Sequence, residues 1–289
     1  MTSAPDFLRL QKIAYQLRQQ ALTMIYQAQS GHPASSLGLA ELFAFLYFAG
    51  GLRYDPQRPD WEKRNPLFVS NGHISALLYA TLAKAGFFPE SELAGFRQLE
   101  SRLQGHPHFL PQGSEKLPGV ENSSGPLGQG LSQAAGYALA LKMAGKKPQV
   151  FCLMSDGEQQ EGQIWEAYQF ILAHKLTNIV GIIDQNNIQI SGKISEIYPA
   201  GKLKLQLLGF GFKVFECDGN NLKELAKTFT EVKEHHEQNS IILLKTVPGK
   251  GVAFMENDPQ WHGKAPSESE YHQAMRELAI KEKNVSRDS

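Results

Sequence analysis

The sequence predicts an α/β fold in which a parallel sheet carries helices on both faces. Two apolar runs, Val150–Met154 and Ile179–Ile183, have the length of strands. They show no alternation with polar residues, which is typical of strands buried on both faces. Between them, Gly162–Lys175 carries apolar residues at helical spacing, and further strands are expected at Phe212–Glu216 and Ile241–Lys245. Apolar strands that alternate with helices in this way indicate a parallel sheet.

The other elements follow from helical spacing and from the positions of Gly and Pro. The first helix is expected to end at Ser30-Gly31-His32-Pro33, and residues 53–66 to form a loop. The remaining predicted elements are helices at 7–29, 35–48 (with Ser36 as its cap), 74–85, 131–144 and 222–236, and a short strand at 67–70. We expect one domain over residues 1–280, followed by a polar, frayed tail over residues 281–289.

Composition excludes several classes of protein. The chain of 289 residues has 29 basic and 29 acidic side chains, so it lacks the basic excess expected of a partner for nucleic acid. The N-terminus lacks an apolar signal core, and the longest apolar stretch, 37–52, is interrupted by Glu41 and is too short to span a bilayer. We therefore expect a cytoplasmic protein with no membrane partner. Cys152 and Cys217 have no spacing typical of a zinc site or disulfide framework.

Residues 104–130 differ from the rest of the chain. They are rich in Gly and Pro, contain little charge, and include His and aromatic residues. A segment of this length without regular structure is usually disordered or functional, and disordered segments are normally more charged. We expect an ordered binding loop.

Polar residues follow two strands that are joined by one helix. Asp156 and Gly157 follow the strand 150–154, and Asn186 follows the strand 179–183. Because ligands bind beyond the carboxyl ends of parallel strands, these residues should lie together at one edge. Their oxygens suit Mg²⁺ or Ca²⁺, and Gly157 would let the backbone approach a phosphate. Taken by itself, Asp156-Gly157 could instead be an ordinary turn, and Asn186-Asn187 an ordinary loop.

The Asp156-Gly157 pair, followed thirty residues later by Asn186, resembles the signature of thiamine-diphosphate enzymes. The resemblance implies that Asp156, Asn186 and the carbonyl of Ile188 bind a divalent cation, Mg²⁺ or alternatively Ca²⁺ or Mn²⁺. It also implies that Asp156, Gly157 and Asn186 contribute to the cofactor site. One position departs from the family, since Ser155 stands where most members have Gly.

Four of the nine histidines lie in turns marked by Gly or Pro: His32, His73, His106 and His262. Any one of them could be a structural turn residue. The set, with its neighbours, resembles transketolase. This resemblance implies that the four line the channel between thiamine and the sugar, and that His73 and His262 also touch the diphosphate. His106 is then the best candidate for moving protons to and from the two-carbon unit.

Two further features match transketolase. The turn Ser124–Gly130 leads into the helix 131–144, and the resemblance implies that the backbone at Gly125 and Leu127 holds the aminopyrimidine ring. Glu161 resembles a glutamate that reaches across a subunit interface and takes part in catalysis, although it could also be a first-turn residue that stabilises the helix dipole. The other five histidines are expected to be structural or exposed. By the same resemblance His108 stands where many members of the family carry an acidic residue, which leaves its role open.

The resemblance covers only the diphosphate-binding half of transketolase. It implies a partner subunit that carries the pyrimidine-binding domain, an α₂β₂ assembly, and transfer of a two-carbon ketol unit from a ketose phosphate to an aldose phosphate, as in the pentose phosphate pathway. The alternatives are a subunit of a 1-deoxyxylulose-5-phosphate synthase or pyruvate dehydrogenase type, a split ketolase for an unusual sugar, and a non-catalytic cofactor-binding module. A dinucleotide-binding fold is disfavoured because no GxGxxG opens a strand–helix unit.

Overall fold

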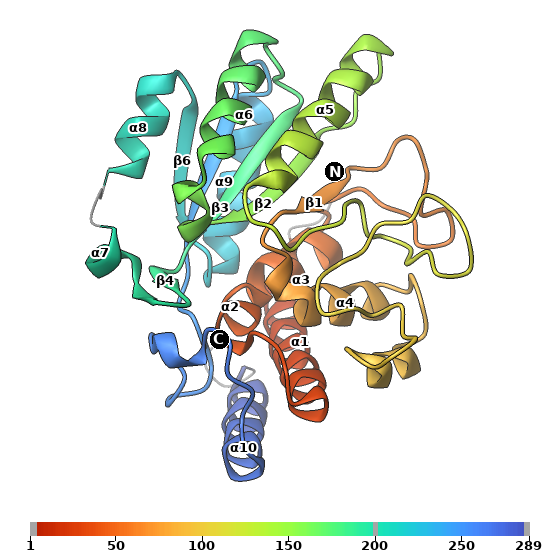
Figure 1. Cartoon of the computed structure of the whole chain (residues 1–289), viewed down its shortest axis with the longest axis vertical. Coiled ribbons are helices and arrows are strands. Elements are labelled where there is room, and N and C mark those ends of the chain that lie inside the picture. Colours follow the sequence, from red (N-terminus) through yellow and green to blue (C-terminus); the bar gives the residue numbers. More distant parts are fainter. Residues whose placement is uncertain (1–4, 199–201, 286–289) are drawn as a thin grey trace.

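A five-stranded parallel sheet forms the centre of the computed structural model, which describes residues 5–198 and 202–285 (Figure 1). All neighbouring strands of this sheet pair in parallel. Their order across the sheet is β1 (Leu67–Val69), β2 (Val150–Ser155), β3 (Ile179–Gln185), β7 (Ser240–Lys245) and β6 (Lys213–Asp218). The five strands and their parallel arrangement were predicted from the sequence, and this prediction is confirmed.

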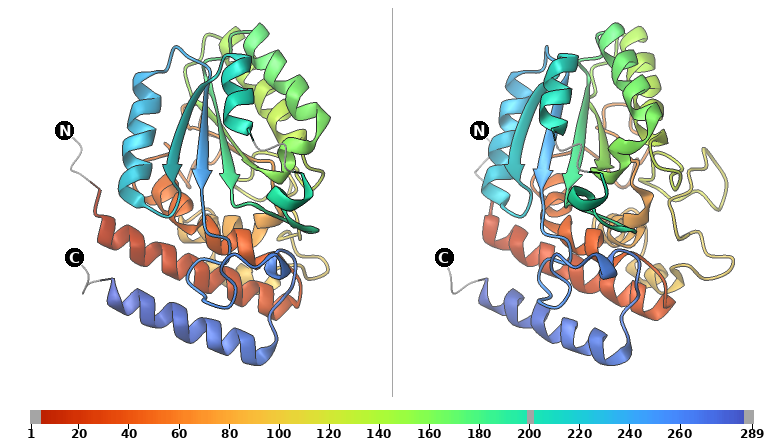
Figure 2. Two further views of the ribbon diagram at one scale, coloured as in Figure 1. Left: turned by 90° about the vertical axis from the view of Figure 1, so that its left-hand side faces the viewer. Right: turned by 60° about the vertical axis from the view of Figure 1, so that its left-hand side comes forward.

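Helices cover both faces of the sheet, as predicted (Figures 1 and 2). Side chains of alternate strand residues enter two separate apolar cores, because successive residues of a strand point to opposite faces. One face packs against α5 (Gln129–Met143), α6 (Gly162–Ala173) and α8 (Leu203–Phe210). The other face packs against α1 (Phe7–Ala28), α3 (Ala40–Phe48), α4 (Ser75–Lys84) and α9 (Leu222–Glu234).

The predicted helix 35–48 is wrong in its details. The chain forms α2 (Pro33–Gly38) and α3, with Leu39 between them in a non-helical conformation. Pro33 begins α2 instead of ending α1, because a proline at the first helical position lacks only an N–H that has no helical partner. Ser36 lies inside α2 and is not its cap. Gly38 contributes to this arrangement, since a Cβ there would lie 3.0 Å from the backbone oxygen of Val247.

The expected frayed tail is also wrong for the residues that are described. Helix α10 (Glu268–Asn284) passes through the start of that tail and lies beside α1 in both views of Figure 2. Ser267 begins it with a capping box, in which its side chain and that of Glu270 bond to each other's backbone N–H. Residues 286–289 of the expected tail lie outside the described residues.

Several short elements were not predicted, because they depend on contacts between distant segments. They are the hairpin β4 (Ile188–Gln189) and β5 (Gly192–Lys193), the turn of helix α7 (Ile194–Ile197), and the 3₁₀ segments η1 (Gly72–Ile74), η2 (Glu90–Gly95), η3 (Gly157–Gln160) and η4 (Pro259–Trp261).

The Gly- and Pro-rich segment before α5 has no regular structure but is held by specific hydrogen bonds. The side chain of Asn122 accepts from Val69 N at 2.9 Å and donates to Val69 O at 3.2 Å, which fastens the segment to the end of β1. Arg64 binds both carboxylate oxygens of Glu121, at 2.8 and 2.7 Å. These contacts fit the expectation of an ordered loop.

Two predictions from composition can be compared with the structure. None of the helices within the described residues combines the length and apolar character needed to cross a bilayer. Cys152 and Cys217 are both free and buried. Burial raises the pKa of the Cys152 thiol well above its usual value and that of Cys217 to about 11, so both thiols stay protonated and unreactive.

A buried ion pair joins the helical layer to the loops beyond the sheet. Arg18 of α1 and Glu41 of α3 are 0% and 1% exposed, and Arg18 Nη2 lies 2.5 Å from Glu41 Oε2. Asn220, in the turn after β6, donates to the same carboxylate oxygen at 2.9 Å and accepts from Val247 N at 2.8 Å. The pair therefore fixes α1, α3 and the segments that follow β6 and β7.

We predict that Glu41→Gln lowers the free energy of unfolding by roughly 3–5 kcal/mol, because it leaves the Arg18 guanidinium buried without an anion. Urea unfolding monitored by circular dichroism would measure this loss. The control is Glu231→Gln, which removes an exposed pair with Lys227 (3.8 Å) and should cost less than about 1 kcal/mol. Equal losses in the two variants would contradict the importance of the buried pair.

Candidate active site at the carboxyl edge of the sheet

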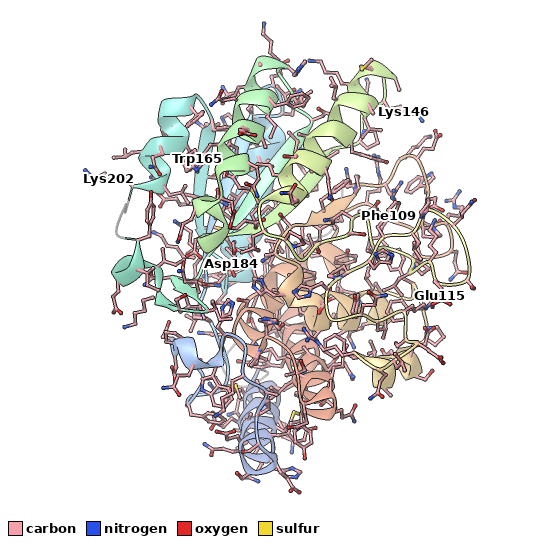
Figure 3. The ribbon with its side chains drawn as sticks, viewed as in Figure 1. Phe109, Glu115, Lys146, Trp165, Asp184 and Lys202 are labelled. Atoms are coloured by element: carbon pink, nitrogen blue, oxygen red, sulfur yellow. The ribbon has the colours of Figure 1, made fainter. Side chains whose placement is uncertain are left out.

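The predicted metal and diphosphate residues meet at the carboxyl edge of the sheet. Ser155 of β2 pairs with Asp184 of β3, so Asp156 and Asn186 follow neighbouring strand ends. Asp156 N donates to Asp184 O at 3.0 Å, and Asp156 Oδ2 accepts from Asn187 N at 2.7 Å. Asp184 is labelled at this edge in Figure 3.

Two carboxylates, Asp156 and Asp184, come together here without a basic partner. Among the described residues, neither forms an ion pair with Lys, Arg or His, although Asp184 accepts from Thr246 Oγ1 at 2.5 Å. Burial, and then the charge of Asp184, raise the pKa of Asp156 to about 7, and burial raises that of Asp184 to about 7. Such a pair favours a bound cation, which would compensate the desolvation of the carboxylates.

The other predicted ligands lie in the turn after β3. Asn186 Nδ2 donates to Asp184 Oδ2 at 2.8 Å and to Ser35 Oγ at 3.3 Å, and Asn186 Oδ1 accepts from Ile188 N at 2.9 Å. No group of three or more His, Cys, Asp or Glu side chains in residues 5–198 and 202–285 could hold a metal ion. A cation at this edge would therefore need amide and carbonyl oxygens together with oxygens of a ligand.

Gly157 begins η3, and its N–H bonds to Asp156 Oδ1 at 2.9 Å. A Cβ at this position would lie 3.5 Å from Gln189, an ordinary contact distance. The protein itself therefore does not require glycine here, which leaves the approach of a ligand as the predicted reason for it.

The four predicted histidines converge, although they come from four separate segments. His32 precedes α2, His73 lies in η1, His106 lies in the Gly- and Pro-rich segment, and His262 follows η4. The ring centre of His32 lies 5.3 Å from that of His73, 5.6 Å from that of His262 and 6.1 Å from that of His106. The ring centres of His73 and His262 are 5.2 Å apart. We call these four residues the histidine cluster.

Burial keeps the histidine cluster neutral. It lowers the pKa of His32 to about 4, with further contributions from His262, Arg97 and His106. Burial also lowers the pKa of His73 well below its usual value, and lowers those of His106 and His262. A neutral imidazole has one donor and one acceptor nitrogen, so each ring can bind a hydroxyl group or take up a proton.

Several buried polar atoms around the histidine cluster have no hydrogen-bond partner within the described part of the chain. They are His32 Nδ1, His73 Nε2, His262 Nδ1, Ser124 Oγ and both polar atoms of the Asn71 side chain. Buried polar groups are normally satisfied, and leaving one unpaired costs roughly 1–3 kcal/mol. Their concentration at one place indicates a site that is completed by a polar ligand.

The turn Ser124–Gly130, which was predicted to hold the aminopyrimidine ring and which we call the aminopyrimidine loop, lies against the histidine cluster. Gly125 has φ +152°, a conformation that favours glycine, and a Cβ there would be 3.6 Å from the ring of His106. Leu127 O accepts from Gln163 Nε2 at 3.0 Å, which ties the loop to α6. The loop is thus held where its backbone can face a ligand.

Glu158, which is fully buried, was not predicted as a site residue from the sequence. Its carboxylate accepts from the Ser70 hydroxyl, from Gly128 N at 2.6 Å and from Ser155 N at 3.1 Å. One side chain thus joins the ends of β1 and β2 to the aminopyrimidine loop. The only signal in the sequence was an acidic residue directly after Asp156-Gly157 at a strand end. This signal does not reveal the role of Glu158, because Ser70 and Gly128 are far away in sequence.

Glu161 and the remaining histidines lie outside the histidine cluster. Glu161 is the exposed N-cap of α6 and not a residue of its first turn, and its side chain accepts no hydrogen bond from the helix. His108 is exposed and lies 3.3 Å from Ser123 Oγ, and His235 Nδ1 contacts Glu231 O.

A cavity of about 650 Å³ opens at the same edge, on the side of α6 and α8. Trp165, labelled in Figure 3, lines it together with Asp156 and Asn187. No residue of the histidine cluster lines this cavity.

Residues 10–286 match the family model described as "Transketolase, thiamine diphosphate binding domain". The chain belongs to the transketolase family. The resemblance seen in the sequence is therefore confirmed, as is the thiamine-diphosphate-binding fold.

Two similar proteins of comparable length are named as transketolase subunits. The chain is 33% identical over 262 residues to a subunit of the apulose-4-phosphate transketolase of Phocaeicola vulgatus, with 91% of each chain covered. It is 34% identical to a subunit of the 6-deoxy-6-sulfo-D-fructose transketolase of a Clostridium species, with 93% of this chain and 96% of the relative covered.

Other transketolases are longer. Human transketolase is 34% identical over 95% of this chain, which spans 43% of its length. The crystal structure of Campylobacter jejuni transketolase superposes with a TM-score of 0.81 at 31% identity, covering 96% of this chain and 48% of the other. The chain thus spans somewhat less than half of these transketolases.

We predict that Glu158→Gln destabilises the fold by about 1–3 kcal/mol, because an amide N–H₂ would replace an acceptor among donors. The aminopyrimidine loop should loosen most, so amide hydrogen exchange at Gly128 and Gly130 should accelerate. Exposed Glu234 at the end of α9 supplies the control, Glu234→Gln, which should change neither quantity. Unchanged exchange at Gly128 in Glu158→Gln would show that the loop does not depend on this carboxylate.

Proposed function

We propose that this chain is the N-terminal subunit of a two-chain transketolase that transfers a two-carbon ketol unit from a ketose phosphate to an aldose phosphate. The supporting observation is the histidine cluster, three of whose rings carry buried nitrogens without partners among the described residues. The segment that follows His32 reaches the edge of the sheet, where Asn186 Nδ2 donates to Ser35 Oγ at 3.3 Å. Four imidazoles whose pKa values are lowered would suit a sugar, which presents a row of hydroxyl groups.

The edge of the sheet would hold the cofactor and its cation. Asp156, Asn186 and the carbonyl of Ile188 would bind Mg²⁺, or Ca²⁺ or Mn²⁺ in its place, and Gly157 would approach the diphosphate. The pair formed by half-buried Asp156 and buried Asp184 supports this assignment, because a cation would offset the desolvation of the two carboxylates. Thiamine diphosphate, when bound, supplies the electron sink that carbon–carbon bond cleavage requires.

The histidine cluster would orient the sugar and move protons. His106 is the most exposed of the four, so it is placed to exchange protons with a substrate hydroxyl. His32, His73 and His262 lie deeper and would donate or accept single hydrogen bonds, with His73 and His262 nearest the diphosphate. Gly125 and Leu127 would present backbone groups to the aminopyrimidine ring.

A partner subunit would complete the site. The proposal rests on the relatives that are named as transketolase subunits and on the longer transketolases, of which this chain spans less than half. The partner would carry the pyrimidine-binding domain, and exposed Glu161 would face it in catalysis. We propose an α₂β₂ assembly that works in the cytoplasm.

The donor and acceptor sugars define a second candidate. The similar subunits are named for apulose-4-phosphate and for 6-deoxy-6-sulfo-D-fructose, which supports a split ketolase acting on an unusual sugar. The two candidates share the site on this chain and differ in what the partner binds at the far end of the substrate.

The test of the proposed function compares the purified chain with the same chain recovered from its native extract together with bound partners. Ketol transfer from xylulose 5-phosphate to ribose 5-phosphate should occur only in the second sample, and a panel of branched and sulfonated ketoses would separate the two candidates. Absence of transfer from every ketose in the recovered complex would overturn the proposal.

We predict that Asp156→Ala abolishes Mg²⁺-dependent binding of thiamine diphosphate, because the site loses its anionic ligand. Isothermal titration calorimetry of the two-chain complex would measure the affinity. Asp218→Ala is the control, since Asp218 is an exposed carboxylate at the end of β6. This variant should bind thiamine diphosphate with unchanged affinity. Unchanged affinity in Asp156→Ala would refute the metal assignment.

We predict that His106→Ala lowers kcat by roughly 10²–10⁴-fold, as expected for loss of a general acid–base group, while cofactor affinity changes little. Steady-state kinetics and calorimetry on the complex give the two quantities. His108→Ala alters an exposed histidine of the same segment and should retain activity. Full activity in His106→Ala would remove His106 from the mechanism.

A further inference from the structure

Arg97 connects the two turns that carry His32 and His106. Its Nη1 donates to Ser30 Oγ at 2.8 Å, two residues before His32. Its Nη2 donates to Gly105 O at 3.1 Å, next to His106. A single guanidinium therefore fixes the separation of two segments that lie far apart in sequence.

The backbone around Arg97 is built for this contact. Arg97 has φ +58°, in the left-handed region that is unfavourable for a residue with a side chain. Arg97 N donates to Leu103 O at 2.9 Å, which closes the turn. Gly105 leaves room for the guanidinium, since a Cβ there would lie 2.9 Å from Arg97 Cζ. A glycine would adopt this backbone conformation with less strain. The hydrogen bonds of the Arg97 side chain to Ser30 and Gly105 therefore offset the strain of its backbone.

We propose that Arg97 is a positioning residue that holds His32 and His106 in one arrangement and supplies a fixed positive charge beside them. The kinetic part of this inference rests on the proposed function. The structural and electrostatic part does not, because it concerns the two imidazoles themselves.

The charge of Arg97 has no close acidic counterpart. It forms no ion pair with a carboxylate of residues 5–198 or 202–285, and its Nε is buried without a hydrogen-bond partner there. The pKa of His32 is lowered by burial first, then by His262 and then by Arg97. The pKa of His106 is lowered by burial first and then by Arg97. Burial lowers the pKa of Arg97 itself, and Tyr79 acts in the opposite direction. Burial, His262, His32 and His106 together lower the pKa of His73.

Two consequences follow for the reaction. Both imidazoles stay neutral at lower pH than they would without Arg97, so they keep an acceptor nitrogen for a substrate proton. Their relative position also persists while the site is empty, which reduces the ordering needed when a sugar binds.

The test uses three variants of the chain in its native complex. Arg97→Gln removes the charge and keeps a hydrogen-bonding side chain of similar reach. Arg97→Lys keeps the charge and loses the fork that spans both turns. Arg102→Gln is the matched control, because Arg102 lies in the same segment but pairs with Glu92 at 2.8 Å, away from the histidine cluster.

The first measurement is hydrogen–deuterium exchange at the imidazole C2 atoms against pH, followed for each histidine by mass spectrometry. In Arg97→Gln the pKa values of His32 and His106 should rise by roughly 0.5–1 unit, because a neighbouring positive charge is gone. Arg97→Lys and Arg102→Gln should keep values close to those of the natural chain. This readout needs no activity, so it remains decisive if the proposed function fails.

The second measurement is the pH profile of ketol transfer. In Arg97→Gln the acidic limb should move to higher pH by the same amount, and kcat should fall about 10- to 100-fold with little change in cofactor affinity. Arg97→Lys should restore the acidic limb but not kcat. Unshifted histidines in Arg97→Gln would overturn the electrostatic role, and full kcat in Arg97→Lys would overturn the positioning role. If Arg97→Gln does not fold, Arg97→Lys still decides the positioning role.

Discussion

The parallel pairing of β2 with β3 is the constraint on which the rest of the site depends. The pairing of Ser155 with Asp184 places the residues after both strands at one edge, where Asp156 bonds to the backbone of Asn187. A shift of one residue would turn Asp156 or Asn186 toward the other face of the sheet. Strands buried on both faces resist such a shift, because alternate residues fill two different cores. The precision of the polar edge is therefore a consequence of apolar packing.

At the histidine cluster, in contrast, buried polar groups lack partners instead of being fixed by apolar packing. Three of its rings carry buried nitrogens without a partner among the described residues, and two neighbouring polar side chains, Ser124 and Asn71, share this condition. Such groups are costly, and a protein keeps them only where the surrounding structure determines their position. Arg97 and Glu158 supply part of that determination, each by joining segments that are distant in sequence. The same burial that makes the site costly keeps its imidazoles neutral, and neutral rings suit a sugar.

Membership of the transketolase family gives these features a common explanation without fixing the substrate. Relatives of similar length are named as subunits, while the longer transketolases extend well beyond the region matched here. The candidate site residues of this chain lie at the edge of the sheet and in the loops next to it. Glu161, at the start of α6, is exposed. In the proposed two-chain enzyme, substrate preference would depend on both polypeptides.

The sequence by itself determined the parallel sheet, its five strands and the residues at its polar edge. Continuous apolar runs such as Val150–Met154 report burial on both faces, and Gly and Pro mark the turns that carry the four histidines, so these features are local. Only the tertiary structure decided the break at Leu39, the course of α10, and the partners of Glu158 and Arg97. Each of these depends on a contact between segments far apart in the chain, such as Val247 against Gly38 or Arg97 with Ser30. Periodicity reports which face of an element is buried, but it carries no information on which distant residue will meet that face.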